Sequence, residues 1–125
     1  MLTLKNKTIF ISGAGAGMGR AVSLLADQAG AKVIATDKSN TALKGLETKN
    51  TTTTVLDVTN KKDVTDFFDK HEAFDGIVNM AGWVHHGQII DTTEQDWHKS
   101  FKINVDSMYY VLSAALPKIL LNKNN

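Results

Sequence analysis

The chain has 125 residues, of which 42% are hydrophobic and 22% charged, and its formal net charge is +1 at pH 7. This length suits one domain with a core of its own, although it is short for a complete doubly wound enzyme. The near-neutral charge, without a cluster of basic residues, argues against nucleic-acid binding, and the absence of cysteine excludes disulfides, thiolate metal sites and a cysteine nucleophile.

A glycine-rich segment stands between the first predicted strand and the first predicted helix. Residues Thr8–Ser12 form a mostly apolar run, which is typical of a strand buried on both faces. Gly13–Arg20 then contains four glycines and leads into a helix. Apolar residues at helical spacing lie on one face of that helix: Met18, Val22, Leu25 and Ala29. A strand, a glycine-rich turn and a helix N-terminus in this order can bind a nucleotide pyrophosphate through free backbone N–H groups.

The spacing of the glycines decides which phosphate-binding motif they fit. The Gly-x-Gly-x-x-Gly fingerprint fails from Gly13, because its third position is Met18. A Walker loop fails because Gly19 is followed by Arg20 where that motif has lysine. The pattern that fits is Gly-x-x-x-Gly-x-Gly, with Gly17 in the middle. Alone it is a weak signal, and an ordinary glycine-rich turn is the alternative.

Two more strands are predicted in the first half of the chain. Ala31–Thr36 is a second buried run, and it ends at Asp37. A weak helix is predicted over Thr41–Lys49. Because the branched Cβ of threonine favours strands, Thr52–Leu56 is predicted to be a third strand near a sheet edge.

The second half of the chain predicts two helices and one strand. A helix over Lys61–His71 is followed by a strand over Asp75–Asn79. Thr93 is a good N-cap for the next helix, with Asp96 at the acidic position of a capping box. From Phe101 onward an apolar stripe predicts one long helix: Val105, Met108, Tyr109, Leu112, Leu116, Ile119 and Leu120.

The alternation of strands with helices predicts a single α/β domain. Right-handed crossovers then join parallel strands, with helices on both faces of the sheet. The expected fold is a Rossmann-like doubly wound parallel sheet of about four strands, incomplete because it corresponds to the first half of such a fold. No apolar run reaches about 18 residues and no signal-peptide h-region opens the chain, so no membrane association is predicted and a cytoplasmic location is expected.

Ligands of an open α/β sheet bind beyond the carboxyl ends of its strands, and two aspartates stand there. Asp37 follows the second strand, where its carboxylate can accept hydrogen bonds from a ribose and would repel a 2′-phosphate, so NAD is favoured over NADP. Lys38 beside it would weaken that discrimination, and a plain turn carboxylate is the alternative. Asp57 follows the third strand and fits two interpretations equally well, an adenine ligand or a cap for the next helix.

Four motifs in the chain together resemble the short-chain dehydrogenase/reductase family. They are Gly13-x-x-x-Gly17-x-Gly19, Asp57-Val58, Asn79-x-Ala81-Gly82 and Asn104 in the long helix. The motifs stand in the family's order, and the resemblance covers the whole chain. Within the family, three stretches are similar to the cytosolic 3-hydroxybutyrate dehydrogenases: Ile34–Asp37, Val55–Thr59 and Ala81–Gly87.

The resemblance implies NAD-dependent hydride transfer at a secondary alcohol or ketone carbon, with 3-hydroxybutyrate as the candidate small-molecule substrate. It implies one set of cofactor-binding residues: Gly13, Ala16, Gly17, Met18, Gly19, Asp37, Asp57, Val58, Asn79, Ala81 and Gly82. Of these, the turn would hold the pyrophosphate, Asp37 the ribose and Asp57 the adenine.

The resemblance also assigns roles outside the cofactor set. Asn104 would be catalytic by holding a water in a proton relay, although a local hydrogen bond in its helix is the alternative. His85 and His86 would lie at the substrate mouth and suit an anionic substrate. Adjacent histidines without supporting ligands do not fit a metal site, so no metal is predicted. Trp83 and Trp97 are interpreted as packing residues.

The family's catalytic serine and Tyr-x-x-x-Lys pair have no counterpart in this sequence. Four residues after Tyr109 comes Ser113, and four after Tyr110 comes Ala114. In the family the tyrosine is the general acid/base and the lysine lowers its pKa. We therefore expect the N-terminal part of an oxidoreductase, truncated before these residues and inactive alone.

Two other functions are compatible with the sequence. One is a non-catalytic dinucleotide-binding module, and the other is an interaction protein that uses the long helix. That helix would be half uncovered in a chain of this length, so an exposed apolar face and homo-oligomers formed through it are expected.

Overall fold

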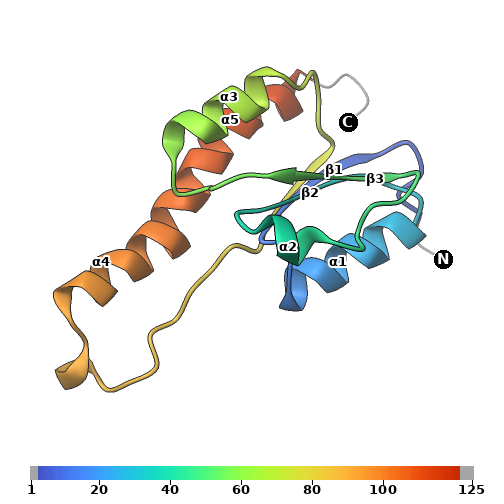
Figure 1. Cartoon of the computed structure of the whole chain (residues 1–125). Helices are drawn as coiled ribbons and strands as arrows, with labels where there is room; N and C mark the ends of the chain where they lie inside the picture. The colour runs from blue at the N-terminus through green and yellow to red at the C-terminus, as the bar shows by residue number, and fades with distance from the viewer. Residues whose placement is uncertain (1–2, 122–125) are drawn as a thin grey trace.

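The computed structural model describes residues 3–121, which form one four-stranded parallel sheet with helices on both faces (Figure 1). The strand order is β3-β2-β1-β4, with β1 at Thr8–Ser12, β2 at Lys32–Asp37, β3 at Thr51–Val55 and β4 at Gly76–Asn79. The crossover helices are α1 (Gly17–Gln28), α2 (Asn40–Leu43) and α3 (Lys61–Asp69). After β4 come a 3-10 turn η1 (Ile89–Asp91), α4 (Glu94–Phe101), a π-helical turn η2 (Lys102–Asp106) and α5 (Ser107–Leu120). The predicted Rossmann-like sheet is confirmed, with β3 at one edge.

Side chains of β1 alternate between two hydrophobic layers. Phe10 belongs to the layer under α3 and α5, together with Phe68 and Val111. Ile11 belongs to the layer under α1 and α2 on the other face. Because both faces of the strand are buried, its sequence is a nearly continuous apolar run and not an apolar–polar alternation.

Small residues form the buried face of α1. Gly19, Ser23 and Ala26 are buried, whereas Met18 is 75% and Leu25 64% exposed. Of the apolar face predicted from helical spacing, Val22 packs against the core, whereas Met18 and Leu25 point away from it. Small side chains let the helix backbone approach the sheet closely, which larger residues at the same positions would prevent.

The helical part of the second crossover is shorter than predicted. The sequence predicts a helix that reaches Lys49, but α2 ends at Leu43. Lys44 leaves the helical region with ψ 135°, and Gly45 adopts φ +80°, a conformation that glycine takes without strain. Leu43 and Leu46 are nevertheless buried, because the irregular turn directs both toward the sheet.

The long C-terminal helix begins as predicted and is interrupted once, at η2. The Thr93 hydroxyl accepts a hydrogen bond from the Asp96 N–H at 3.0 Å, which caps α4. The face of α5 that is buried beside α3 carries Ser107, Val111 and Ala115. Most of the predicted apolar stripe lies outside this contact and is exposed: Val105, Met108, Tyr109, Leu116 and Leu120. Within residues 3–121, no helix combines the length and the apolarity that a membrane crossing needs.

Asp27, near the end of α1, joins this helix to the start of β3. Its carboxylate accepts hydrogen bonds from the hydroxyls of Thr48 and Thr51 and, at 3.4 Å, from the Asn50 amide. The Thr48 and Thr51 hydrogen bonds hold the pKa of Asp27 below its ordinary value; burial opposes this, and Asn50 and the Lys49 charge add to it.

This network is expected to make stability depend on pH. Because the folded pKa of Asp27 lies below the unfolded value of about 3.9, its contribution is complete above that value and is lost as the pH falls through the folded pKa. Asp27→Asn should lower the free energy of unfolding by about 1 kcal/mol at neutral pH. It should also flatten the decline of that free energy between about pH 5 and pH 2. Urea unfolding across this range measures both effects, and an unchanged pH dependence would exclude this role for Asp27.

Candidate functional site

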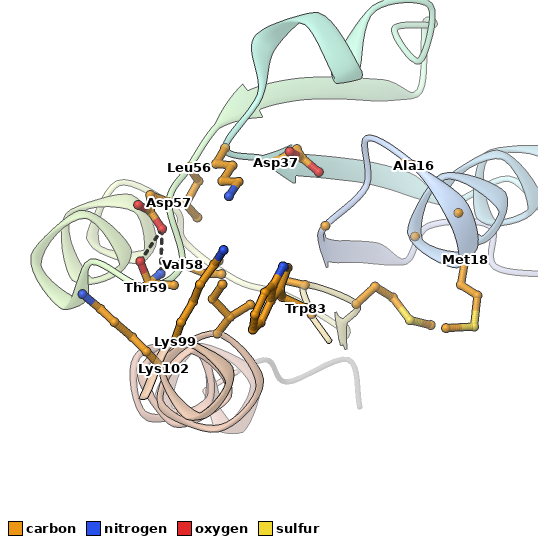
Figure 2. A pocket seen from close by; sticks show the side chains of 18 residues that line it. Ala16, Met18, Asp37, Leu56, Asp57, Val58, Thr59, Trp83, Lys99 and Lys102 are labelled. Atoms are coloured by element: carbon orange, nitrogen blue, oxygen red, sulfur yellow. Dashed lines mark hydrogen bonds between the residues drawn. The ribbon is translucent and has the colours of Figure 1, made fainter. Parts of the chain in front are cut away.

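A cavity of about 750 Å³ lies beyond the carboxyl ends of the strands (Figure 2). All of the predicted cofactor residues except Asn79 line it: Gly13, Ala16, Gly17, Met18, Gly19, Asp37, Asp57, Val58, Ala81 and Gly82. Its wall also includes residues that were not predicted as cofactor ligands: Lys38, Leu56, Thr59, Met80, Trp83, Lys99, Lys102 and Ile103. The structure thus brings together segments that are far apart in the sequence.

Three glycines of the turn stand where a side chain does not fit. Gly13 has φ +62°, and a Cβ there would lie 2.6 Å from the Ala81 nitrogen. A Cβ at Gly19 would overlap the carbonyl oxygen of Gly13. Gly15 was not singled out by the motif, yet it is buried and a Cβ there would lie 2.8 Å from an Asp37 oxygen. These glycines allow the turn, α1 and the segments after β2 and β4 to meet through their backbones.

The N-terminus of α1 opens onto the cavity. Its N-cap, Ala16, provides no side-chain hydrogen bond to the first turn of the helix. Gly17 has φ +53°, and a Cβ there would meet no atom within 4 Å. Backbone N–H groups at the positive end of a helix favour an anion, and the open space at Gly17 lets a phosphate reach them.

Asp37 is fixed by two backbone hydrogen bonds. Its Oδ2 accepts from the Gly15 N–H at 3.0 Å, and its Oδ1 accepts from the Ser39 N–H at 2.9 Å. Each carboxylate oxygen keeps a further lone pair. The side chain is thus oriented before any ligand arrives and can still accept hydrogen bonds from a diol in the cavity.

Asp57 lines the cavity and does not cap α3. The N-cap is Asn60, whose Oδ1 accepts the N–H groups of the first turn, so the capping interpretation of Asp57 is wrong. Burial raises the pKa of Asp57, but hydrogen bonds from the hydroxyl and N–H of Thr59 and the charges of Lys38 and Lys102 outweigh it and leave the pKa below its ordinary value. The carboxylate is therefore ionised at neutral pH.

Asn104 holds the loop that follows β4. Its Oδ1 accepts the Trp83 N–H at 2.9 Å, while its Nδ2 donates to the Trp83 carbonyl at 2.6 Å and to the Ser100 hydroxyl at 3.1 Å. The Ser12 hydroxyl fixes the start of the loop by accepting the Ala81 N–H at 3.3 Å. The Asn104 side chain itself does not line the cavity.

Trp83 is part of the cavity wall. The Lys99 ammonium lies 4.0 Å from its ring centroid, a cation–π contact. Figure 2 shows both side chains pointing into the space between the segment of Asp57 and the turn that carries Ala16. Trp83, interpreted from the sequence as a packing residue, is half-buried and also forms part of the cavity wall. No sequence pattern indicates this place in the wall, because the contact with Lys99 depends on how α4 approaches the loop.

Besides Asn104, three predicted site residues lie outside the cavity. Asn79 ends β4 and pairs with Ser12 of β1. His85 lies 3.7 Å from the Asp96 carboxylate, and His86 is exposed. Among residues 3–121, no three potential metal ligands come together.

Comparison with known proteins finds relatives along nearly the whole chain. The family model described as enoyl-(acyl carrier protein) reductase matches residues 13–125. Rat dehydrogenase/reductase SDR family member 6 is 44% identical over 122 residues, which are 97% of this chain and 50% of the relative. The 2-keto-3-deoxy-L-fuconate dehydrogenase of Xanthomonas campestris is 46% identical over 119 residues, or 94% of this chain and 40% of the relative. The chain thus spans about half the length of these relatives, or less.

Solved structures share the fold at lower identity. A short chain dehydrogenase from Shigella flexneri superposes with a TM-score of 0.90 at 20% identity, covering 98% of this chain and 61% of its own. A second Shigella structure, complexed with NADP, gives a TM-score of 0.89 at 20% identity, with 98% and 56% covered. At this identity the similarity supports the fold alone.

Proposed function

Because the chain belongs to the short-chain dehydrogenase/reductase family, we propose that it is the NAD-binding part of an oxidoreductase acting on a secondary alcohol or ketone. The family binds a nicotinamide dinucleotide, which supplies the hydride donor or acceptor when bound. The observation that supports the site most strongly is the pairing of an uncapped helix N-terminus with an oriented carboxylate, Asp37, in one cavity. The open space at Gly17 fits a phosphate, which a side chain there would exclude.

In this proposal each segment of the wall holds one part of the dinucleotide. The first turn of α1 binds the pyrophosphate through its N–H groups, and the Asp37 carboxylate accepts hydrogen bonds from the hydroxyls of the adenosine ribose. Asp57 accepts a hydrogen bond from the adenine amine, with Val58 beside it. Asn104 keeps Gly82 and Trp83 in place, so the loop after β4 stays fixed on the nicotinamide side.

A proton-relay role for Asn104 is also part of the proposal. Both N–H bonds of its amide are already used, toward Trp83 and Ser100. A water held by Asn104 must therefore donate a hydrogen bond to one of its oxygens. In this proposal Asn104 therefore has two roles: its side chain holds the loop by hydrogen bonds to Trp83, and one of its oxygens orients a water.

Preference for NAD over NADP is expected to depend on Asp37. Its carboxylate would repel a 2′-phosphate, whereas Lys38 and Lys102 line the same cavity and oppose that effect. Asp37→Ala should weaken NADH binding about tenfold or more, because charge-assisted hydrogen bonds to the ribose are lost. It should leave NADPH binding unchanged or stronger. Fluorescence titration with each cofactor measures the ratio, and an unchanged ratio would refute the assignment.

The reaction itself requires groups that the sequence does not supply. We attribute the catalytic serine and the Tyr-x-x-x-Lys pair to polypeptide beyond residue 125, since the relatives are about twice as long. Reading the gene past the codon for residue 125 tests this directly: a continuing frame with that motif supports the proposal, and a native stop codon favours the non-catalytic module.

A short hydroxy or keto acid such as 3-hydroxybutyrate is the proposed substrate class. One relative is named for a keto acid, 2-keto-3-deoxy-L-fuconate, and His85 and His86 would offer ring N–H donors to the carboxylate of such a substrate.

Homo-oligomers through the exposed face of α4 and α5 are proposed as well. A monodisperse monomer in sedimentation at micromolar concentration would exclude this assembly. A cytoplasmic location stays a prediction.

A further inference from the structure

Arg20, the only arginine of the chain, makes a two-point contact outside the cavity. It is half-buried near the start of α1. Its Nη1 donates to the Ala42 carbonyl at 3.0 Å, and its Nη2 donates to the Lys44 carbonyl at 3.1 Å. Both acceptors belong to the segment that connects β2 to β3.

These carbonyls lie at the end of α2, a helix too short to be stable through its own hydrogen bonds. A four-residue helix satisfies almost none of its own backbone groups. The guanidinium supplies two of the missing donors, and its positive charge suits the negative end of the helix. Lysine has no planar fork and donates from one nitrogen, so it cannot serve two carbonyls in the same way.

The other end of α2 is tied to the ribose-binding carboxylate. The Ser39 hydroxyl caps α2 by accepting the Ala42 N–H at 3.2 Å, while the Ser39 N–H donates to Asp37. Asp37 in turn accepts the Gly15 N–H, and a Cβ at Gly15 would lie 2.5 Å from the Ala42 Cβ. The contacts therefore form a closed ring that runs from α1 through α2 and Asp37 back to the glycine-rich turn.

We infer that Arg20 is a positioning residue for recognition of the cofactor's ribose diol, acting through Asp37. It fixes α2, α2 fixes the Ser39 N–H, and that N–H sets one of the two hydrogen bonds that orient the Asp37 carboxylate. This inference rests on the proposed function, because it gives Asp37 the ribose as its ligand. Arg20 itself touches no ligand.

A double-mutant cycle between Arg20 and Asp37 tests the inference. Binding of NADH to the chain is titrated for the wild type, Arg20→Lys, Asp37→Ala and the double variant, and melting temperatures are recorded for all four. Arg20→Lys keeps the charge and is expected to weaken NADH binding about tenfold, while leaving the fold intact. In the Asp37→Ala background the same change should have no further effect, because the group that Arg20 positions is gone. Lys32→Arg, at an exposed position at the amino end of β2, is the matched control for exchanging one cationic side chain for another.

Each outcome decides between distinct conclusions. Saturable NADH binding by the wild type, a tenfold loss in Arg20→Lys and non-additivity with Asp37→Ala support the inference. Equal binding by the wild type and Arg20→Lys overturns it and leaves the proposed function standing. Additive losses, or losses that follow a fall in melting temperature, assign Arg20 to the fold alone and overturn it too. No saturable binding by the wild type instead refutes the proposed function.

Discussion

Replacing Gly19 with alanine is expected to lower the free energy of unfolding by about 3 kcal/mol. Its Cβ would overlap the Gly13 carbonyl oxygen and would lie 2.8 Å from the Gly13 carbonyl carbon and 3.2 Å from the Ala14 Cα. All of these are backbone atoms of a tight turn, so no rotamer change relieves the clash. Forcing extra atoms into a packed site costs about 1–3 kcal/mol and more where the backbone must move. Because small domains are stable by only about 5–15 kcal/mol, this loss is large.

A second glycine provides the control for Gly19. A Cβ at Gly76 in β4 has the terminal carbon of the Ile9 side chain as its nearest neighbour, at 3.0 Å. That atom can move by rotation, so Gly76→Ala should change the free energy of unfolding by less than about 1 kcal/mol. Urea denaturation compares the wild type, Gly19→Ala and Gly76→Ala. Identical midpoints for Gly19→Ala and the wild type would mean that α1 does not pack closely against the backbone of the glycine-rich turn.

Gly17→Ala is expected to produce the opposite pattern, with a small effect on folding and a large one on binding. The folded chain pays about 1–2 kcal/mol for a side chain at φ +53°, and it has no clash to relieve because the Cβ faces open space. In the bound state that methyl group occupies the space through which a phosphate reaches the N–H groups of α1. Loss of those hydrogen bonds should weaken NADH binding about 100-fold.

Isothermal titration and urea denaturation of the same Gly17→Ala sample separate the two effects. In Gly17→Ala the loss of binding free energy should exceed the loss of unfolding free energy, whereas Gly19→Ala should lose both together. Wild-type affinity in Gly17→Ala would show that no phosphate approaches this part of the turn.

Much of the sheet could be predicted because its strands carry strong local signals. The apolar run of β1 predicts its bounds correctly, and the threonine run places β3 within one residue. The buried faces of the helices were harder to predict from the sequence. In α1 the buried residues include Gly19 and Ser23, which carry no hydrophobic signal, and the exposed Leu25 does carry one. Periodicity identifies an apolar face but not the element that covers it.

The cavity was predictable wherever a residue follows a strand directly. Asp37 ends β2 and Asp57 lies just beyond β3, both strands that the sequence identifies, and the topology then brings the strand ends together. Lys99 and Lys102 come from the helix after a long loop, so only the folded arrangement places them in the wall. Gly15 was missed because its role depends on contacts with Asp37 and α2, which the glycine spacing does not encode.

A backbone amide NMR titration of the chain with NADH shows whether the cavity is a dinucleotide site. Saturable shifts are expected in four segments that contribute to the cavity wall: Gly13 to Gly19, Asp37 to Ser39, Asp57 to Thr59 and Ala81 to Trp83. Amides at the far ends of the strands, such as those of Thr8 and Lys32, should not move. No saturable shift, or shifts confined to the exposed face of α5, would refute a dinucleotide site in this cavity.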